Sequence, residues 1–427
     1  MAAHEAAVEA TRCIYCHDAP CARACPAGID VAAFIRKIQT RNLRGSARLL
    51  LARNPLSASC ARVCPTEDLC SGACVLLDMG VKPIDIGRLQ RHVMDWAMAR
   101  GDPEIPLAPS TGRRVTVVGA GPAGIACAVE LRRRGHAVTV YDERARPGGL
   151  GTHAIAAHKM TPDFAVSEVE WLASCGFLLH NGTRVGEHVT FGELEESSDA
   201  IFIGVGLGVP RRLEVEGEEL EGVVDALPLI AAHRVGGDLP LVLEGRRVVV
   251  LGGGNTATDS ALLATLLGAS RVTIAYRRST AEMPAYRSEL ELARDRGVEL
   301  LLLHAPRRVL GDGQVEGLEL QPMRLGEPDA SGRRRPVPLE EAEPVTLDCD
   351  VVVRALGQGV DNKLLAGIEG IRVIRGRIRV DPETGQTQNP RYYAGGDCVN
   401  GGREVVHAVA EGRRAALAID RMLREED

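Results

Sequence analysis

Short apolar runs alternate with stretches of helical periodicity from residue 112 onward, which is the pattern of a layered α/β fold. The apolar run at 115–118 predicts a buried strand of a parallel sheet. A glycine-rich turn, a helix and a second strand at 137–141 follow it. The same order returns with a strand at 247–251, a helix that extends to residue 267 and a strand at 271–276. We therefore expect two related units, one inserted in the other.

The first 110 residues have helical spacing and no strand pattern. Apolar positions within 29–52 and 86–99 predict helices. Three prolines between residues 102 and 109 predict a linker. Because 427 residues are too many for one compact core, we expect a small helical domain ahead of the α/β domains.

The turn after the first strand has the spacing G-x-G-x-x-G, formed by Gly119, Gly121, Pro122, Ala123 and Gly124. The first glycine allows a tight turn, the second lets the backbone approach a pyrophosphate, and the third lets the helix lie close to its strand. Asp142 ends the second strand, where a ribose hydroxyl needs an acceptor. These features predict a dinucleotide site, and the alternative is a glycine-rich turn in some other α/β protein.

Two further segments narrow the dinucleotide to FAD. Arg-Pro-Gly-Gly ends at Gly149 and precedes Leu150, and Gly396 and Asp397 lie near the C-terminus. The arrangement resembles the two-dinucleotide flavoprotein family, in which the first fingerprint holds FAD and the late Gly-Asp meets the ribityl-phosphate part. The alternative for Asp397 is an ordinary turn aspartate.

The second unit predicts a nicotinamide dinucleotide site with the variant spacing G-x-G-x-x-A, formed by Gly252, Gly254, Asn255, Thr256 and Ala257. No acid ends its second strand; Arg277 and Arg278 stand there instead. Since guanidinium groups attract a 2′-phosphate, NADP(H) is favoured over NAD(H). The alternative is that these arginines pair with Glu282 or Glu289. Hydride transfer between nicotinamide and flavin needs no protein acid or base, so we nominate no catalytic residue.

Eight of the twelve cysteines fall within the first 74 residues, as C-x2-C-x4-C-x3-C-P and C-x3-C-P-x4-C-x3-C. In two-cluster ferredoxins the Cys before proline ligates the other cluster, so Cys25 should leave the first group. The count and spacing predict two [4Fe–4S] clusters, with zinc as the main alternative. The other four cysteines are isolated, which argues against a redox Cys pair of the thioredoxin-reductase kind.

The cysteine segments CIYCHDAPCARACP and NPLSASCARVCPTEDLCSGAC, with IDIGRLQRHVMDWA and both nucleotide units, resemble the electron-input half of dihydropyrimidine dehydrogenase. The similarity is strongest to the flavin- and cluster-bearing subunit of the bacterial two-subunit enzyme and extends, more distantly, to the glutamate synthase small subunit. The resemblance implies one cluster on Cys13, Cys16, Cys21 and Cys74, and another on Cys25, Cys64, Cys70 and Gln90. It implies that Cys60 is not a ligand. Glutamate-synthase-type relatives carry glutamate at the Gln90 position, which favours the pyrimidine branch.

The chain departs from that family in two places. The family usually has a segment of the form I-P-x-F-R-L-P near the flavin, where this chain has IAAHKMT at 155–161. The bacterial two-subunit enzyme is generally NAD-linked, whereas Arg277 and Arg278 favour NADP(H). Both departures concern the electron donor and acceptor rather than the fold.

The predicted fold class is an α/β two-dinucleotide-binding flavoprotein, an FAD domain with an inserted NAD(P) domain, preceded by a helical domain that holds two [4Fe–4S] clusters. The expected boundaries are 1–110 for the iron–sulfur domain, 111–240 and 355–427 for the FAD domain, and 241–354 for the NAD(P) domain. A net charge of −6 and the absence of a long apolar run argue against nucleic-acid and membrane partners. The N-terminus lacks a signal-peptide pattern, so we expect a cytoplasmic protein.

These features predict an electron-transfer subunit that passes electrons from NAD(P)H through FAD and the clusters to a separate catalytic subunit. An FMN-containing dihydropyrimidine dehydrogenase subunit is the expected partner. Alternatives with the same redox groups are the glutamate synthase small-subunit type and the electron-input subunit of another iron–sulfur oxidoreductase. A stand-alone NAD(P)H:acceptor reductase and a non-catalytic redox sensor are the alternatives from other classes.

Overall fold

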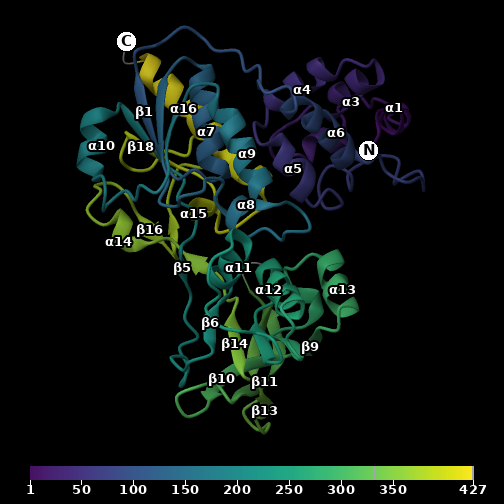
Figure 1. Cartoon of the computed structure of the whole chain (residues 1–427), viewed down its shortest axis with the longest axis vertical. Coiled ribbons are helices and arrows are strands. Elements are labelled where there is room, and N and C mark those ends of the chain that lie inside the picture. Colours follow the sequence, from purple (N-terminus) through teal and green to yellow (C-terminus); the bar gives the residue numbers. More distant parts are fainter. Residues whose placement is uncertain (330–331, 426–427) are drawn as a thin grey trace. The chain divides into compact units, whose positions relative to one another are not determined.

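The computed structural model describes residues 1–329 and 332–425. The chain divides into two compact units, one formed by Met1–Val209 with Gln358–Asp427 and the other by Pro210–Gly357. Figure 1 shows the helices and strands of both units, and each unit is described by itself below. None of the described helices has the length and apolar content that a membrane span requires.

The first unit begins with a group of short helices. They are α1 (Ala3–Thr11), α2 (Pro20–Arg23), α3 (Val31–Gln39), α4 (Leu43–Leu51), α5 (Ser57–Val63) and α6 (Ile86–Met98). The predicted helical stretch 29–52 is therefore two helices. The chain turns at Arg41, whose φ is +59°, and the Asn42 side chain then caps α4 by accepting from the Gly45 N–H at 2.8 Å.

A five-stranded parallel sheet with the order β18-β4-β1-β2-β3 follows. Its strands are β1 (Arg114–Val118), β2 (Ala137–Tyr141), β3 (Leu178–His180), β4 (Ala200–Ile203) and β18 (Tyr392–Ala394). Its helices are α7 (Pro122–Arg133), α8 (Leu150–His153), α9 (Pro162–Ala173), α10 (Phe191–Ser197), α14 (Asn362–Leu365), α15 (Asp397–Asn400) and α16 (Val405–Glu425). Two small ribbons, β5 (Val209–Pro210) with β15 (Gln358–Gly359) and β16 (Val373–Ile374) with β17 (Arg377–Ile378), complete it.

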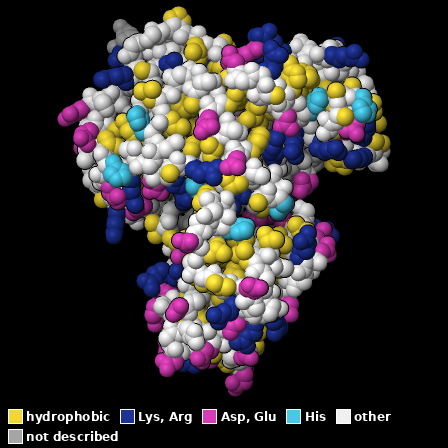
Figure 2. Space-filling model, in the orientation of Figure 1, with side chains coloured by type: hydrophobic (Ala, Val, Ile, Leu, Met, Phe, Trp, Pro, Cys, Tyr) yellow, Lys and Arg dark blue, Asp and Glu magenta, His cyan; other side chains and the backbone are white. Residues whose placement is uncertain are grey.

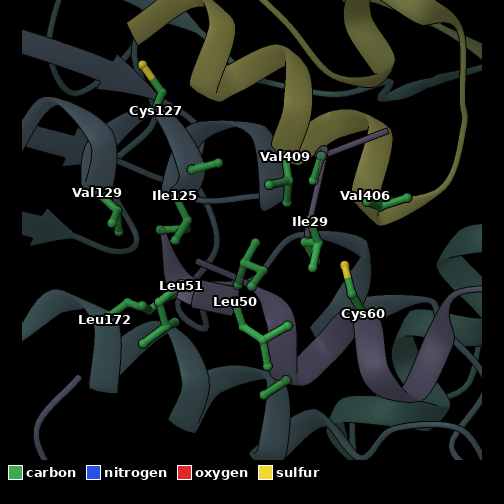
Figure 3. Packing of buried hydrophobic residues seen from close by; sticks show 14 of the residues in the cluster. Ile29, Leu50, Leu51, Cys60, Ile125, Cys127, Val129, Leu172, Val406 and Val409 are labelled. Carbon is green, nitrogen blue, oxygen red and sulfur yellow. The ribbon is translucent and has the colours of Figure 1, made fainter. Parts of the chain in front are cut away.

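One hydrophobic core joins the N-terminal helices to this sheet. Figure 3 shows Leu50 and Leu51 of α4 near Ile125 of α7 and Leu172 of α9. Val409 of α16 belongs to the same cluster of buried residues. Burial of this apolar surface holds the cysteine-bearing helices on the five-stranded sheet β18-β4-β1-β2-β3, called the flavin-type sheet below.

The second unit contains a parallel sheet with the order β6-β14-β7-β8-β9. Its strands are β6 (Val223–Asp225), β7 (Arg247–Leu251), β8 (Arg271–Tyr276), β9 (Glu299–Leu302) and β14 (Val351–Arg354), with helices α11 (Ala226–Val235), α12 (Asn255–Leu266) and α13 (Arg287–Asp295). A short 3₁₀ helix, Thr280–Glu282, precedes α13. The polar stretch 312–345 lies in an antiparallel sheet formed by β10 (His304–Leu310), β11 (Gly317–Pro328), β12 (Arg334–Pro338) and β13 (Val345–Asp348).

Candidate cofactor and cluster sites

The turn between β1 and α7 is built on close backbone approach. Gly119 has a φ of +104°, and a Cβ on it would lie 2.5 Å from the Gly204 carbonyl oxygen. A Cβ on Gly124 would lie 1.9 Å from the Gly119 carbonyl oxygen. Gly121 precedes α7 without a side-chain cap, and Pro122 occupies its first turn. The N-terminus of α7 thus has the form that binds a dinucleotide pyrophosphate.

Asp142 lies at the carboxyl end of β2, as predicted, and is nearly buried. Its carboxylate accepts from the Ala120 N–H at 2.6 Å and from the Arg144 N–H at 2.9 Å. Burial raises the pKa of Asp142 above its usual value, and the two N–H donors oppose that rise. Asp142 therefore also fixes the glycine turn.

The other predicted FAD residues meet this turn. Gly149 has a φ of +55°, and its Cβ would lie 2.9 Å from the Gly121 Cα. Gly396 has a φ of +78°, and its Cβ would lie 2.9 Å from the Ala123 Cβ. Leu150 begins α8 and is partly exposed. The absence of side chains at Gly149 and Gly396 therefore lets these two segments lie against the first glycine turn and α7.

Asp397 begins α15, directly after Gly396. Burial raises the pKa of Asp397 to about 6, and the nearby carboxylates of Glu411 and Glu404 act in the same direction. Glu411 on α16 accepts from the Gly396 N–H at 2.7 Å. Glu411 is not among the predicted residues, because it lies 15 residues after Gly396 and no sequence motif links the two positions.

A small pocket adjoins the turn. The flavin-type half lines it with residues that include Ala120, Gly121 and Gly148, and the N-terminal helices contribute Leu56 and Ser59. The glycine turn and the cysteine-bearing helices therefore share one space.

Four predicted ligands lie together in the first unit. Cys13, Cys16, Cys21 and Cys74 line a single small pocket, with apolar neighbours such as Ile35 and Leu76. Burial, together with the neighbouring thiols Cys13, Cys74 and Cys16, raises the pKa of Cys21 to about 11. The positively charged core of an iron–sulfur cluster would offset the cost of ionising these thiols, because cysteine ligands bind iron as thiolates.

The other four cysteines of the N-terminal segment, Cys25, Cys60, Cys64 and Cys70, form a second group. A hydrogen bond with the Cys60 thiol and burial raise the pKa of Cys64, and Cys70 and Cys25 add to the effect. The Gln90 side chain is buried on α6, and its Nε2 donates to the Ser57 carbonyl oxygen at 2.7 Å. That hydrogen bond uses the amide nitrogen, so the amide oxygen is the end of the side chain suited to bind iron.

The second glycine turn repeats the design of the first. Gly252 has a φ of +149°, and its Cβ would lie 2.5 Å from the Ala355 carbonyl oxygen. Gly254 caps α12, where Thr256 follows and Ala257 is fully buried. Asn255 accepts the Tyr286 N–H at 2.9 Å. The turn and helix N-terminus have the form that holds a second dinucleotide.

The structure separates the two predicted arginines. Arg278 is buried; its Nη2 lies 3.0 Å from Asp329 Oδ2, and its Nε donates to the Arg334 carbonyl oxygen at 2.7 Å. Arg277 is exposed and makes no ion pair with the described residues. Partial desolvation and the guanidinium groups of neighbours that include Arg278 lower its pKa.

Glu282, one alternative partner of these arginines, instead pairs with Arg334 at 2.6 Å. Asp329, the observed partner of Arg278, directly follows β11, so this pair depends on the tertiary position of that strand.

Family models match almost the whole chain. Residues 1–102 match dihydropyrimidine dehydrogenase domain II with its 4Fe-4S cluster, and residues 113–412 match the pyridine nucleotide-disulphide oxidoreductases. The chain belongs to the pyridine nucleotide-disulphide oxidoreductase family. The predicted fold class is confirmed, because the iron–sulfur domain precedes the oxidoreductase domain.

The chain matches some relatives over nearly their whole length and others over about 60% of it. The chain is 36% identical to the glutamate synthase [NADPH] small chain of Escherichia coli (strain K12), over 97% of this chain and 91% of that one. It is 33% identical to the NAD-dependent dihydropyrimidine dehydrogenase subunit PreT of the same strain, over 97% and 93%. It is 37% identical to the NADP(+)-dependent formate dehydrogenase subunit beta of Moorella thermoacetica over 95% of this chain, but spans only 60% of that subunit.

The fold also matches Mycobacterium tuberculosis FprA in complex with NADPH, with a TM-score of 0.62 and 22% identity over 74% of this chain and 86% of that one. This match covers the oxidoreductase fold.

We expect Gly149→Ala to weaken FAD binding. The added Cβ would meet Gly121, so the dissociation constant should rise about tenfold, or about 1.4 kcal/mol. The measurement is flavin retention by absorbance and titration of the apoprotein with FAD. Gly182→Ala is the matched control, since Gly182 has a φ of +67° with nothing within 4 Å of its Cβ. Equal FAD affinity in both variants would contradict the assignment.

Proposed function

We propose that this chain passes electrons from NADPH through FAD and two [4Fe–4S] clusters to a separate catalytic protein in the cytoplasm. The observation that carries the proposal is the cavity lined by Cys13, Cys16, Cys21 and Cys74, thiols from both cysteine groups. These helices share one hydrophobic core with the glycine turn of the flavin-type sheet. A flavin supplies the chemistry that converts a hydride into single electrons.

The proposed FAD residues are those around the first glycine turn: Gly119, Gly121, Pro122, Ala123, Gly124, Asp142, Gly149, Leu150, Gly396 and Asp397. The proposed NADP(H) residues are Gly252, Gly254, Asn255, Thr256, Ala257, Arg277 and Arg278. Arg278 is proposed to contribute indirectly, through its ion pair with Asp329. The glycines place backbone N–H groups and helix N-termini at the phosphates.

The second cluster is assigned to Cys25, Cys64, Cys70 and Gln90. Grouping of three of these thiols supports this assignment. Zinc fits the cysteines less well, because it needs four ligands at about 2.3 Å around one ion. Four thiols around a cavity suit a polynuclear cluster better.

NADPH is the proposed donor because Arg277 offers an exposed guanidinium group beside the second glycine turn. Two of the relatives are named for NADP(+) or NADPH, and PreT is named for NAD.

The proposed partner is an FMN-containing catalytic subunit of the dihydropyrimidine dehydrogenase type. Gln90 and the match of residues 1–102 support this type. A large chain of the glutamate synthase type is the second candidate, favoured by the 36% identity to its small chain.

We expect Cys21→Ala to lose one cluster and keep FAD. Iron should fall from about eight to about four atoms per chain, while flavin reduction by NADPH continues. Iron analysis and anaerobic absorbance spectra measure both. Cys175→Ala is the control, because it removes a thiol outside the cysteine-rich segment and should leave iron unchanged. Unchanged iron in Cys21→Ala, or loss of flavin reduction, would contradict the assignment.

We expect Arg277→Ala to raise the KM for NADPH by about tenfold to a hundredfold, and the KM for NADH by less than about twofold, because one charge-assisted contact to phosphate is lost. Steady-state reduction of a dye acceptor measures both constants. The matched control is Arg287→Ala, since Arg287 is exposed in the same unit and pairs only with Glu291 at 2.8 Å. Equal rises for both nucleotides would make Arg277 a structural residue.

The proposed function is tested by capture of the partner from the native cell, followed by reconstitution. We expect a bound FMN protein whose flavin is reduced by NADPH only when this chain is present. An isolated chain with rapid dye reduction and no partner would instead indicate a stand-alone reductase.

A further inference from the structure

Glu168 is a fully buried carboxylate that bridges the flavin-type sheet and the cysteine-bearing helices. It lies on α9, and its Oε1 accepts from the Ala58 N–H at 2.9 Å and the Ser59 N–H at 3.1 Å. Its Oε2 accepts from the Ser59 N–H at 3.0 Å and from the Ser59 hydroxyl. One side chain therefore holds the first turn of α5 by four hydrogen bonds.

Helix α5 connects this anchor to the second cysteine group. Cys64 ends the helix, and its N–H donates to the Cys60 carbonyl oxygen at 3.1 Å. At the other end, the Ser57 carbonyl oxygen accepts from Gln90 Nε2 at 2.7 Å. Movement of α5 would therefore displace two of the proposed ligands of the second cluster.

The same anchor borders the space beside the glycine turn. Ser59, which binds Glu168, and Val169, the residue after Glu168, both line the small pocket that Gly121 also lines. Glu168 thus lies in the wall between the proposed FAD site and α5.

Arg62 is the charged side chain facing this anchor. Its guanidinium group lies 3.6 Å from the centre of the Phe164 ring on α9 and pairs with Asp95 on α6. Burial raises the pKa of Glu168 to about 7, against the opposing effect of the Ser59 and Ala58 donors and Arg62. Burying a carboxyl group costs free energy unless hydrogen bonds compensate it, and the donors from Ala58 and Ser59 provide that compensation.

We propose that Glu168 is a positioning residue for electron transfer, which fixes α5 and so sets the placement of the second cluster relative to the flavin. This inference rests on the proposed function. Electron transfer slows as the distance between two redox groups increases, so a shift of α5 that moved the second cluster away from the flavin would slow this step. Loss of the anchor should therefore slow the step between flavin and cluster and leave the preceding step between NADPH and flavin unchanged.

The test compares Glu168→Gln and Ser59→Ala in the full chain with its cofactors. Glu168→Gln keeps the side-chain shape but turns an amide NH₂ toward a backbone N–H donor. Ser59→Ala removes only the hydroxyl bond and is the milder change. Glu170→Gln is the matched control, because Glu170 lies on the same helix and is exposed. Anaerobic stopped-flow with NADPH follows flavin and cluster absorbance separately, and electron paramagnetic resonance records the reduced clusters.

We expect flavin reduction within about twofold of the unmodified protein in every variant. Cluster reduction should slow by clearly more than twofold in Glu168→Gln and by a smaller factor in Ser59→Ala, with an altered resonance signal from one cluster. If both variants match Glu170→Gln in cluster rate and signal, the inference is overturned. If Glu168→Gln does not fold, Ser59→Ala decides alone. If NADPH fails to reduce the clusters of the unmodified protein, the proposed function fails with the inference; if it succeeds and the variants are normal, only the inference fails.

Discussion

The first unit depends on glycines at a few positions where two backbone segments approach so closely that no Cβ would fit. A Cβ on Gly124 would lie 1.9 Å from the Gly119 carbonyl oxygen, and one on Gly412 would lie 2.0 Å from the Ala123 carbonyl oxygen. Strand β1, helix α7 and helix α16 therefore touch through their backbones, although α16 comes from the far end of the chain. Because these elements meet so closely, the late Gly396 turn reaches the first glycine turn, and a two-part FAD site becomes possible.

Carboxylates that are buried (Asp142 and Glu168) or partly buried (Glu411) hold the loops that this close packing brings together. Asp142 binds the Ala120 N–H of the glycine turn, Glu411 binds the Gly396 N–H, and Glu168 binds the first turn of α5. A buried carboxylate is costly unless donors surround it, and backbone N–H groups are donors that no substitution removes except proline. Figure 2 shows acidic and basic side chains interspersed on the visible surface. Those surface carboxylates contact solvent, whereas Asp142 and Glu168 are buried and bind backbone N–H groups.

Local sequence patterns predicted the parts of the structure that local chemistry determines. Glycine spacing and apolar runs gave both strand–turn–helix–strand units, and the resemblance grouped Cys13 with Cys74, which the cavity now brings together. Contacts that depend on tertiary placement could not be predicted. The Arg278–Asp329 pair needs the β11–β12 hairpin, and the Glu168–Ser59 bond joins residues 109 positions apart. The break at Arg41 did have a local signal, in the capping residue Asn42.

The distribution of buried apolar residues fits the two demands on an electron-transfer chain. One cluster extends from Ala6 in α1 to Leu423 in α16, so the cysteine-bearing helices and the flavin-type sheet are packed as one body. The nucleotide unit has clusters of its own, around Val250 and around Leu318. Electron transfer between fixed groups needs constant geometry, whereas a nicotinamide nucleotide must bind and leave in each cycle. A shared core for the fixed groups and a separate core for the exchanging one meet both requirements, because strain from nucleotide binding in one core need not alter the packing of the other.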